Sequence, residues 1–333
     1  MKRIRLGVCG VGRIGRLHAE NIAKNVEKAK LVAVADPIRS LANSVAKSLW
    51  VHMYTSPEEM MKKEELDGVV VATPTQTHAD IVQLAVDTHL PVLLEKPIAL
   101  TMKDANKIVS AVKRSGIKFQ VGFNRRWDPS YIKAKRSIVK GKIGHPLTVK
   151  TCARDPKPPP DEYIKGSGGI FVDQCIHDID VALWLMGSSV RQVWATGSTL
   201  VYPQFSRYGD YDNAIAILRF SNSALGIIEA SRSSAYGYDL RTEVLGDSGQ
   251  LSIGNWKEDS IRLSTKNGTM EDQYPWFMER FAESYRRESN GFCDYVAKGD
   301  ASPVSAEEGG DALRIAIAAR ESARKNTTIY LSR

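Results

Sequence analysis

Apolar and polar positions alternate in blocks over the first 122 residues. Short apolar runs are separated by segments in which apolar residues recur with the spacing of one helix face. The apolar runs are Ile4–Cys9, Leu31–Ala35, Gly68–Ala72, Pro91–Leu94 and Lys118–Gly122. The helical segments are Arg13–Lys24, Ser40–Leu49, Thr77–Thr88 and Thr101–Ser115. Strands that are apolar on both faces and alternate with helices predict an α/β domain with a parallel sheet over residues 1–122.

The pattern changes after Gly122. Three consecutive prolines within Asp155–Asp161 exclude a helix or the interior of a sheet there. Further helices are expected over Pro129–Lys140, Phe171–Met186, Pro275–Ala297 and Ala306–Lys325. Strands of period two are expected over Gln192–Thr199, Asn213–Phe220, Leu225–Ser231, Asp239–Leu245 and Gln250–Ile253, with a last β-like segment over Thr327–Leu331. We predict an α+β domain with a large, mainly antiparallel open sheet over residues 123–333, and allow for a return of the final helix to the first domain.

The composition narrows the class of protein. The chain has 333 residues, of which 43% are hydrophobic and 25% charged, and this excludes a disordered chain, a collagen-like fibre and a disulfide-rich miniprotein. Its four cysteines form no CxxC pair, so we interpret them as core residues in a reducing compartment. No apolar stretch approaches the roughly 18 residues of a membrane span. We expect a cytoplasmic protein without a membrane partner.

The formal charge of +8 raises the question of a nucleic-acid partner. Most of the excess basic charge lies in the first 122 residues, no basic block is interleaved with aromatic residues, and no DNA- or RNA-binding motif occurs. We therefore expect no nucleic-acid partner.

A glycine-rich turn follows the first predicted strand. The string Gly10-Val11-Gly12-Arg13-Ile14-Gly15 is a GxGxxG that opens a helix within a βαβ unit, the context in which this motif indicates dinucleotide binding. Gly10 permits the tight turn, Gly12 lets the backbone approach a diphosphate, and Gly15 lets the helix pack close to the sheet. The diphosphate would lie at the helix N-terminus. The plainer alternative is a Rossmann-like turn that binds no ligand.

Asp36 ends the second predicted strand, about twenty residues beyond the glycines. A carboxylate there accepts hydrogen bonds from both ribose hydroxyls of an adenosine and repels a 2′-phosphate. This favours NAD over NADP, although the guanidinium of Arg39 nearby weakens the preference.

Two further segments contain candidate catalytic residues. Glu95-Lys96-Pro97 lies at the carboxyl end of a predicted strand, where open α/β sheets bind ligands. The alternative is a surface lysine after a strand. The second segment has Asp173, His177 and Asp180 at helical spacing along one predicted helix face. A histidine between carboxylates is oriented and made more basic, which suits a general base; the alternative is a hydrogen-bonded histidine in a core helix.

The remaining histidines give no sign of a metal centre. They show no ligand spacing with one another, and no cysteine or second histidine completes a site around His177, so we expect no metal. These histidines are His18, His52, His78, His89 and His145.

Along its whole length the chain resembles the glucose–fructose oxidoreductase/inositol dehydrogenase family. The shared features, in order, are the GVGRIG turn, Asp36, Ala72-Thr73-Pro74, Glu95-Lys96-Pro97 and the DxxxH helix. The cues that point to the inositol dehydrogenase branch are Gly122-Phe123-Asn124-Arg125-Arg126, Arg154-Asp155-Pro156, Gly168-Gly169 before Asp173, and Tyr236-Gly237-Tyr238-Asp239.

The resemblance implies a reaction and a set of site residues. NAD would take a hydride from a ring carbon of a cyclic polyol, myo-inositol giving 2-keto-myo-inositol, while His177 takes the hydroxyl proton, Asp173 modulates it and Lys96 polarises the hydroxyl. The cofactor contacts would come from Gly10, Gly12, Arg13, Ile14, Gly15, Asp36, Thr73, Pro74, His78, Glu95 and Lys96. The substrate contacts would come from Lys96, Asn124, Arg125, Asp155, Asp173, His177, Asp180 and Tyr236. Relatives are usually homotetramers that pack the open face of the antiparallel sheet, and we expect the same here.

Two alternatives remain open at this point. One is a dehydrogenase for another inositol isomer, a monosaccharide or an anhydrosugar, because a hydrogen-bonding site discriminates strongly between hydroxyl orientations. The other is a non-enzymatic protein that senses NAD, because fold does not fix function. The joint presence of Lys96, Asp173 and His177 speaks against the second alternative.

Overall fold

The computed structural model describes residues 3–254, 257, 261–266, 268–299 and 301–332. The chain divides into two compact units. The first is made of Met1–Trp127 with Glu283–Leu313, and the second of Asp128–Ala282 with Arg314–Arg333. Among the described residues, every helix is too short or too polar to cross a membrane.

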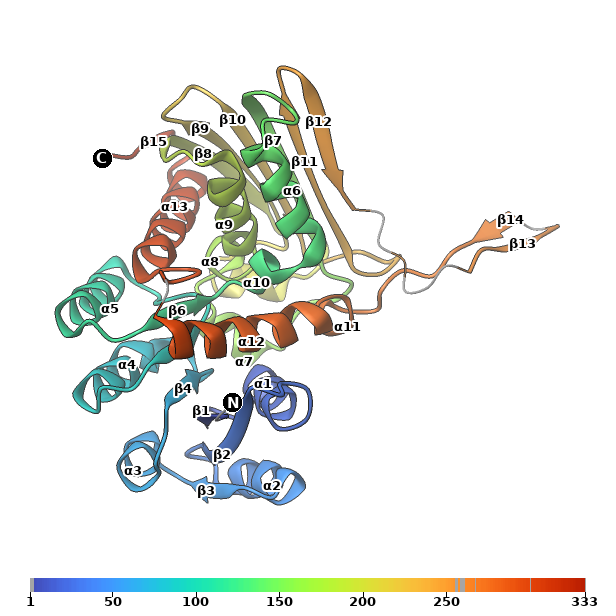
Figure 1. Ribbon diagram of the computed structural model, residues 1–333. Coiled ribbons are helices and arrows are strands. Elements are labelled where there is room, and N and C mark those ends of the chain that lie inside the picture. Colours follow the sequence, from blue (N-terminus) through green and yellow to red (C-terminus); the bar gives the residue numbers. More distant parts are fainter. Residues whose placement is uncertain (1–2, 255–256, 258–260, 267, 300, 333) are drawn as a thin grey trace. The chain divides into compact units, whose positions relative to one another are not determined.

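The first unit is built on a six-stranded parallel sheet (Figure 1). Its strands lie in the order β3-β2-β1-β4-β5-β6, so the order reverses direction between β1 and β4. Ligands of open α/β sheets bind outside the carboxyl ends of the strands at such a reversal. The strands are β1 (Ile4–Cys9), β2 (Ala29–Ala35), β3 (His52–Tyr54), β4 (Gly68–Val71), β5 (Val92–Glu95) and β6 (Phe119–Gly122).

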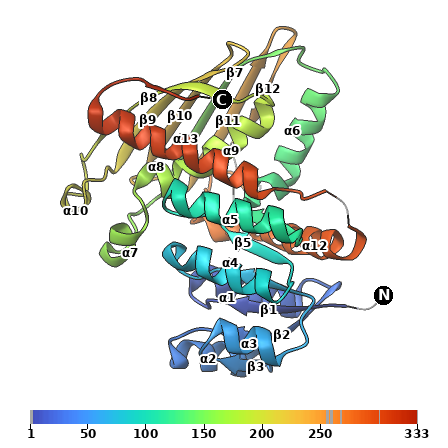
Figure 2. The same ribbon diagram turned by 90° about the vertical axis from the view of Figure 1, so that its left-hand side faces the viewer.

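Helices cover both faces of this sheet (Figure 2). Apolar residues of α1, α2 and α12 form a buried cluster on one face together with β1 and β2. On the other face, α4 packs against both α3 and α5. The helices are α1 (Arg13–Lys24), α2 (Arg39–Leu49), α3 (Pro57–Lys63), α4 (His78–Asp87), α5 (Met102–Ser115) and α12 (Ala282–Lys298); α13 (Ala306–Lys325) begins in this unit and ends in the other.

The second unit is built on a seven-stranded sheet of order β12-β11-β7-β10-β9-β8-β15. All neighbours in it are antiparallel except β7 and β10, which run parallel. Helices α6 and α9 pack on one face. The strands are β7 (Pro146–Arg154), β8 (Val190–Ser198), β9 (Asn213–Phe220), β10 (Leu225–Ser231), β11 (Asp239–Gly246), β12 (Gly249–Ile253) and β15 (Ile329–Tyr330), with a separate ribbon of β13 (Leu263–Thr265) and β14 (Gly268–Met270). The helices are α6 (Pro129–Val139), α7 (Asp161–Gly166), α8 (Ile170–Asp173), α9 (Cys175–Met186), α10 (Gln204–Arg207) and α11 (Phe277–Arg280).

The opposite face of this sheet carries apolar side chains that stay partly exposed. Burial alternates strictly along β9, whose even-numbered residues from Ala214 to Phe220 are buried. On the open face, Ile217 of β9 lies directly opposite Ile227 of β10. Five apolar residues of this face are 37–47% exposed, namely Ile215, Ile217, Leu225, Ile227 and Leu245.

Local sequence signals explain where several helices begin and end. The side chain of Thr101 accepts the backbone N–H of Asp104 at the start of α5, and Gly116 ends that helix in the left-handed conformation. Asp128 caps α6 by accepting the N–H groups of Ser130 and Tyr131.

The predicted fold class is confirmed, whereas two predicted helices are divided and one strand of the second sheet was not predicted. The helix predicted over Phe171–Met186 is divided into α8 and α9 at Gln174, whose side chain binds carbonyls of the sheet. The helix predicted over Pro275–Ala297 is divided at Phe281. Strand β7 was not predicted, because its solvent-facing positions hold polar residues such as Lys150 and the apolar alternation is weak. The functional division of the chain at residue 122 stays a prediction.

Candidate active site

The glycine-rich turn has the geometry that a dinucleotide requires. Gly10 has a φ of +81°, and a Cβ there would lie 2.7 Å from the carbonyl oxygen of Ala72. A Cβ on Gly15 would lie 1.8 Å from the carbonyl oxygen of Gly10, so fold packing demands glycine at both positions. At Gly12, in contrast, a Cβ would meet nothing within 4 Å. Packing does not explain glycine there, whereas close approach of a ligand does.

The N-terminus of α1 is open to an anion. Its N-cap residue Gly12 is exposed and makes no side-chain cap, and the first turn contains no acidic residue. Arg13 is also exposed, and Ile14 is partly exposed. Uncapped N–H groups at the positive end of a helix dipole bind phosphate groups. These residues therefore fit the diphosphate of NAD.

Asp36 fixes the glycine-rich turn from the end of β2. Its Oδ2 accepts the N–H of Val11 at 2.9 Å, and its Oδ1 accepts the N–H of Ile38 at 2.9 Å. Each oxygen retains a second lone pair, which suits an acceptor for ribose hydroxyls. The side chain of Asp36 thus lies beside the glycine-rich turn.

His78 connects the segments that follow β4 and β5. Its Nδ1 lies 3.0 Å from the carbonyl oxygen of Pro97 and its Nε2 lies 3.1 Å from that of Thr73. The side chain is 1% exposed, and burial lowers the pKa of His78 below its ordinary value of 6.5. His78 therefore holds the backbone near Thr73 and Pro74 against the turn after Glu95.

Glu95 and Lys96 lie where β5 ends. The carboxylate of Glu95 is buried; its Oε1 lies 2.7 Å from Nε2 of His18, and its Oε2 accepts the backbone N–H of Lys96 at 3.1 Å. The peptide bond between Lys96 and Pro97 is cis. Lys96 itself is partly exposed at the ligand-binding edge of the parallel sheet. Two predicted substrate residues, Asn124 and Arg125, follow β6 and are 3% exposed.

In the second unit, one guanidinium connects two of the predicted site carboxylates. Arg232 donates from Nη2 to Asp173 at 2.7 Å and from Nη1 to Asp155 at 3.1 Å. The other oxygen of Asp173 accepts the hydroxyl of Tyr163 at 2.8 Å. Arg232 is 5% exposed, and although burial opposes its charge, the two carboxylates raise the pKa of its guanidinium. The arrangement keeps both carboxylates ionised and fixed in orientation.

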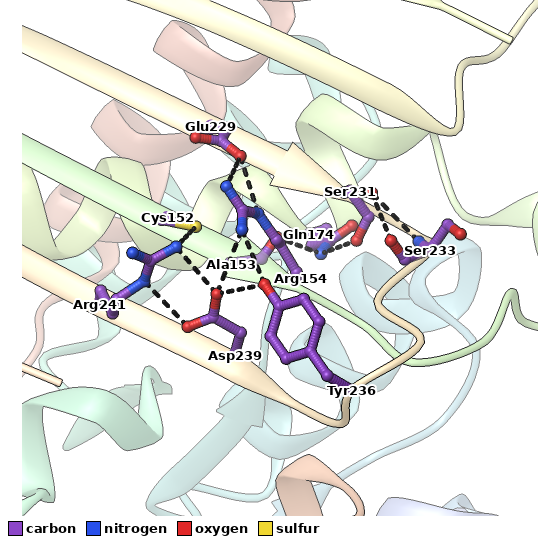
Figure 3. Close-up of polar contacts among 10 residues, drawn as sticks. All are labelled: Cys152, Ala153, Arg154, Gln174, Glu229, Ser231, Ser233, Tyr236, Asp239 and Arg241. Atoms are coloured by element: carbon purple, nitrogen blue, oxygen red, sulfur yellow. Dashed lines mark hydrogen bonds and ion pairs between the residues drawn. The ribbon is translucent and has the colours of Figure 1, made fainter. Parts of the chain in front are cut away.

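His177 and Asp180 follow on α9. Asp180 is 1% exposed and His177 is partly exposed, so the histidine is the more accessible of the two. Gln174 anchors the start of this helix, because its amide donates to the carbonyls of Ala153 and Ser231 (Figure 3).

Tyr236 lies in a separate cluster of charged residues (Figure 3). Its hydroxyl donates to Asp239 and accepts from Arg154, both at 2.7 Å, and the residue is 55% exposed. Arg154 also pairs with Glu229, and Arg241 pairs with Asp239. The cluster borders a hollow of about 320 Å³.

Sequence reasoning missed several residues around the predicted ones. They are His18, Tyr163, Gln174, Arg232 and Glu288. Arg232 directly follows a predicted strand, and that position was a usable signal. The pairing of Arg232 with Asp155 had no such signal in the sequence. It depends on the parallel pairing of Arg154 with Ser231, which places the residues that follow them, Asp155 and Arg232, at the same edge of the sheet.

Comparison with known proteins agrees with this geometry. The family model described as an oxidoreductase family with an NAD-binding Rossmann fold matches residues 4–123, and the C-terminal alpha/beta domain of the same oxidoreductase family matches residues 135–331. The chain is 38% identical to scyllo-inositol 2-dehydrogenase (NAD(+)) of Bacillus subtilis, over 99% of this chain and 96% of that protein. It is 37% identical to myo-inositol 2-dehydrogenase of Thermotoga maritima, over 98% of each.

A solved structure is similar over the same length. Scyllo-inositol dehydrogenase of Lactobacillus casei, crystallised with NAD(H) and scyllo-inositol, aligns with a TM-score of 0.94 and 29% identity over 99% of each chain. The chain thus belongs to the NAD-binding Rossmann-fold oxidoreductase family that includes glucose–fructose oxidoreductase and the inositol dehydrogenases, and it is an NAD-dependent oxidoreductase.

Proposed function

We propose that this protein oxidises a cyclic polyol, myo-inositol in particular, to 2-keto-myo-inositol with NAD as the hydride acceptor. The relatives that are 38% and 37% identical over nearly the full chain carry the names of scyllo- and myo-inositol dehydrogenases. The observation that carries the proposal is the buried guanidinium of Arg232, which orients the carboxylates of Asp155 and Asp173. Fixed, ionised carboxylates recognise the hydroxyl groups of a polyol.

In this proposal Lys96, Asp173 and His177 are the catalytic residues. His177 accepts the proton of the reacting hydroxyl, Asp173 modulates the imidazole, and Lys96 binds and polarises that hydroxyl. When bound, NAD supplies the hydride acceptor. The partial exposure of His177 beside buried acidic residues supports its assignment as the proton acceptor.

The other proposed substrate contacts supply hydrogen bonds to the remaining ring hydroxyls. They are Asn124, Arg125, Asp155, Asp180 and Tyr236. The hydroxyl of Tyr236 already engages Arg154 and Asp239, so in our proposal it exchanges one of these partners for substrate.

The proposed cofactor residues are those around the glycine-rich turn and the ends of β2, β4 and β5. The acceptor geometry of Asp36 supports NAD over NADP. These residues are Gly10, Gly12, Arg13, Ile14, Gly15, Asp36, Thr73, Pro74, His78, Glu95 and Lys96.

The test is a substrate panel. Purified protein is incubated with NAD and, separately, with myo-inositol, scyllo-inositol, other inositol isomers and monosaccharides, and NADH formation is followed by absorbance. We expect the highest kcat/KM with myo-inositol. A higher kcat/KM with scyllo-inositol would change the proposed isomer but keep the proposed substrate class of cyclic polyols. Scyllo-inositol is the second candidate substrate because the Bacillus relative is named for it. The absence of NADH with every polyol and sugar would refute the proposal.

We further propose that the protein is a cytoplasmic homotetramer. All four cysteines are buried thiols that take part in no disulfide bond, as expected in a reducing compartment. The apolar residues of the open sheet face, centred on Ile217 and Ile227, provide the surface for subunit contact. In the same proposal, residues 1–122 bind the cofactor, while residues 123–333 bind substrate and form the oligomer.

A further inference from the structure

Three ionisable side chains meet inside the first unit, next to Lys96. His18 comes from α1, Glu95 from the end of β5, and Glu288 from α12. His18 and Glu288 are 0% exposed and Glu95 is 7% exposed. Each offers a nitrogen or oxygen atom, and these three atoms all lie within 4.8 Å of one another.

The two carboxyl groups of this cluster have different surroundings. Both oxygens of Glu95 are engaged, one with Nε2 of His18 and one with the backbone N–H of Lys96. Neither oxygen of Glu288 has a hydrogen-bond partner among the described residues. A buried carboxylate without a partner is strongly disfavoured and becomes protonated instead. Glu288 is therefore the carboxyl group suited to hold a proton.

Electrostatics supports the same assignment. Burial, and then the nearby carboxylate of Glu95, raise the pKa of Glu288 well above its ordinary value of 4.5. A charged Glu288 would place two carboxylates close together in a buried cluster that contains a single imidazole. A proton on Glu288 removes that conflict.

A bound divalent cation is the alternative explanation for the cluster. Two ligands of one tetrahedral ion, each about 2.1 Å from it, stand roughly 3.4 Å apart. His18 and Glu95 are 2.7 Å apart, which is a hydrogen-bond distance. The ring of His18 also packs edge-on against Tyr285, with centroids 5.6 Å apart. The geometry therefore favours a proton over a metal ion.

We propose that neutral Glu288 and the hydrogen-bonded Glu95–His18 pair form a buried support that fixes the backbone of Lys96. His18 and Glu288 are positioning residues in this arrangement. Glu95 transmits their effect, because the oxygen that accepts the N–H of Lys96 belongs to the same carboxylate that binds His18. The consequence for catalysis rests on the function proposed above, whereas the proton on Glu288 and the position of Lys96 do not.

The first experiment detects the proton directly. The infrared spectrum of Glu288→Gln is subtracted from that of the wild-type protein at neutral pH. The measurement is made once in water and once in D₂O. We expect a protonated-carboxyl C=O band that belongs to the wild type and shifts in D₂O. Its absence would overturn the assignment of a neutral Glu288. Metal analysis accompanies the spectra, and one tightly held divalent ion per chain that is lost in Glu288→Gln would overturn it as well.

The second experiment follows Lys96. Lysines are reductively methylated with ¹³C, and the Lys96 signal is assigned by its loss in Lys96→Arg. We expect His18→Ala to shift the Lys96 signal. His18→Gln should bring the signal back toward its wild-type position, because the glutamine amide can donate to Glu95. The control is Glu283→Gln, which removes an exposed ion pair with Arg286 on α12 and should leave the signal in place. A signal that stays in place in folded His18→Ala would refute the support of Lys96.

Kinetics then connects the support to turnover. A displaced catalytic group costs roughly tenfold to a hundredfold in rate. We expect His18→Ala to lower kcat by that amount with little change in the Kd for NADH, and Glu288→Gln, a neutral isostere, to stay within about threefold of wild type. Unchanged kcat in His18→Ala would contradict the positioning role. If the wild type oxidises no polyol, the proposed function fails, but the infrared and NMR results still decide this inference.

Discussion

Arg232 donates a 2.7 Å hydrogen bond from its Nη2 to Oδ2 of Asp173, four residues before His177. Both side chains of this pair are 6% exposed, and the second arm of the guanidinium reaches Asp155. Because Tyr163 occupies the other oxygen of Asp173, the carboxylate has partners on both sides. Its orientation is therefore set by the protein before any substrate arrives.

Replacement of Arg232 by Gln should damage both stability and turnover. Removal of one partner from a buried ion pair costs about 3–5 kcal/mol, because the remaining carboxylates lose their counter-charge. We expect the free energy of unfolding, measured by urea titration, to fall by an amount of this order, and kcat to fall roughly a hundredfold. Arg232→Lys keeps the charge but loses the two-armed geometry, so its loss should be intermediate. A kcat near wild type in Arg232→Gln would contradict the role of this pair.

His177→Ala should abolish most turnover while the cofactor still binds. Removal of a general base typically costs about 10²–10⁴-fold. The Kd for NAD, measured by calorimetry, should stay near wild type, since every proposed cofactor residue precedes residue 97. If kcat instead remains near wild type, the proton acceptor is not His177, and Lys96 becomes the candidate.

The glycine-rich turn illustrates what the sequence predicts well. The roles of Gly10 and Gly15 follow from steric rules, and the structure places backbone atoms within 2.7 Å and 1.8 Å of where their Cβ atoms would be. The helix over Arg13–Lys24 and the strand over Ile4–Cys9 have the predicted bounds, because helix and strand periods are local properties.

The Arg232 contacts illustrate what the sequence does not predict. They require β7 and β10 to pair in parallel, and this non-local register has no signature in either segment. Glu288 is likewise one of three acidic residues in a charged helix, and only tertiary packing buries it beside Glu95. Hydrophobic patterns along the chain predict helices and strands. Contacts between side chains from distant segments become known only from the three-dimensional structure.

Asp36→Asn should weaken the preference for NAD over NADP. The amide oxygen still accepts an N–H from the glycine-rich turn, while the charge that repels a 2′-phosphate is gone. We expect the ratio of kcat/KM for NAD to that for NADP to fall by roughly tenfold. The wild type should prefer NAD; equal kcat/KM values for the two cofactors in the wild-type enzyme would refute the role of Asp36.

Ile217→Glu should split the proposed tetramer. Ile217 faces Ile227 on the open side of the sheet, and a charge placed there on each copy would be desolvated and unpaired on assembly. Light scattering coupled to gel filtration should give a tetramer mass for the wild type and a smaller mass for the variant. Val139→Glu is the control, since that residue is 73% exposed at the end of α6, a helix that packs on the other face of the sheet. A wild-type monomer, or a variant that remains tetrameric, would contradict the proposed interface.

Asp212 and Asp210 should give stability opposite dependences on pH. Burial alone would raise the pKa of Asp212, but hydrogen bonds from the N–H groups of Leu200, Tyr202 and Val201 outweigh it and hold the pKa below its ordinary value of 3.8. Its contribution is therefore full above that value and is lost as the pH falls below it and through the lowered pKa of the folded state. For Asp210, burial raises the pKa above 3.8, so the ionised group costs stability as the pH rises.

Urea unfolding of the wild type, Asp212→Asn and Asp210→Asn at a series of pH values between about 3 and 7 tests both signs. The stability advantage of the wild type over Asp212→Asn should shrink as the pH falls below about 4. Protonation removes the negative charge that strengthens the hydrogen bonds from the three backbone N–H groups. The advantage over Asp210→Asn should grow over the same change, because protonation relieves the buried charge. Parallel curves for the two variants would show that neither carboxylate titrates with the shift that its partners impose.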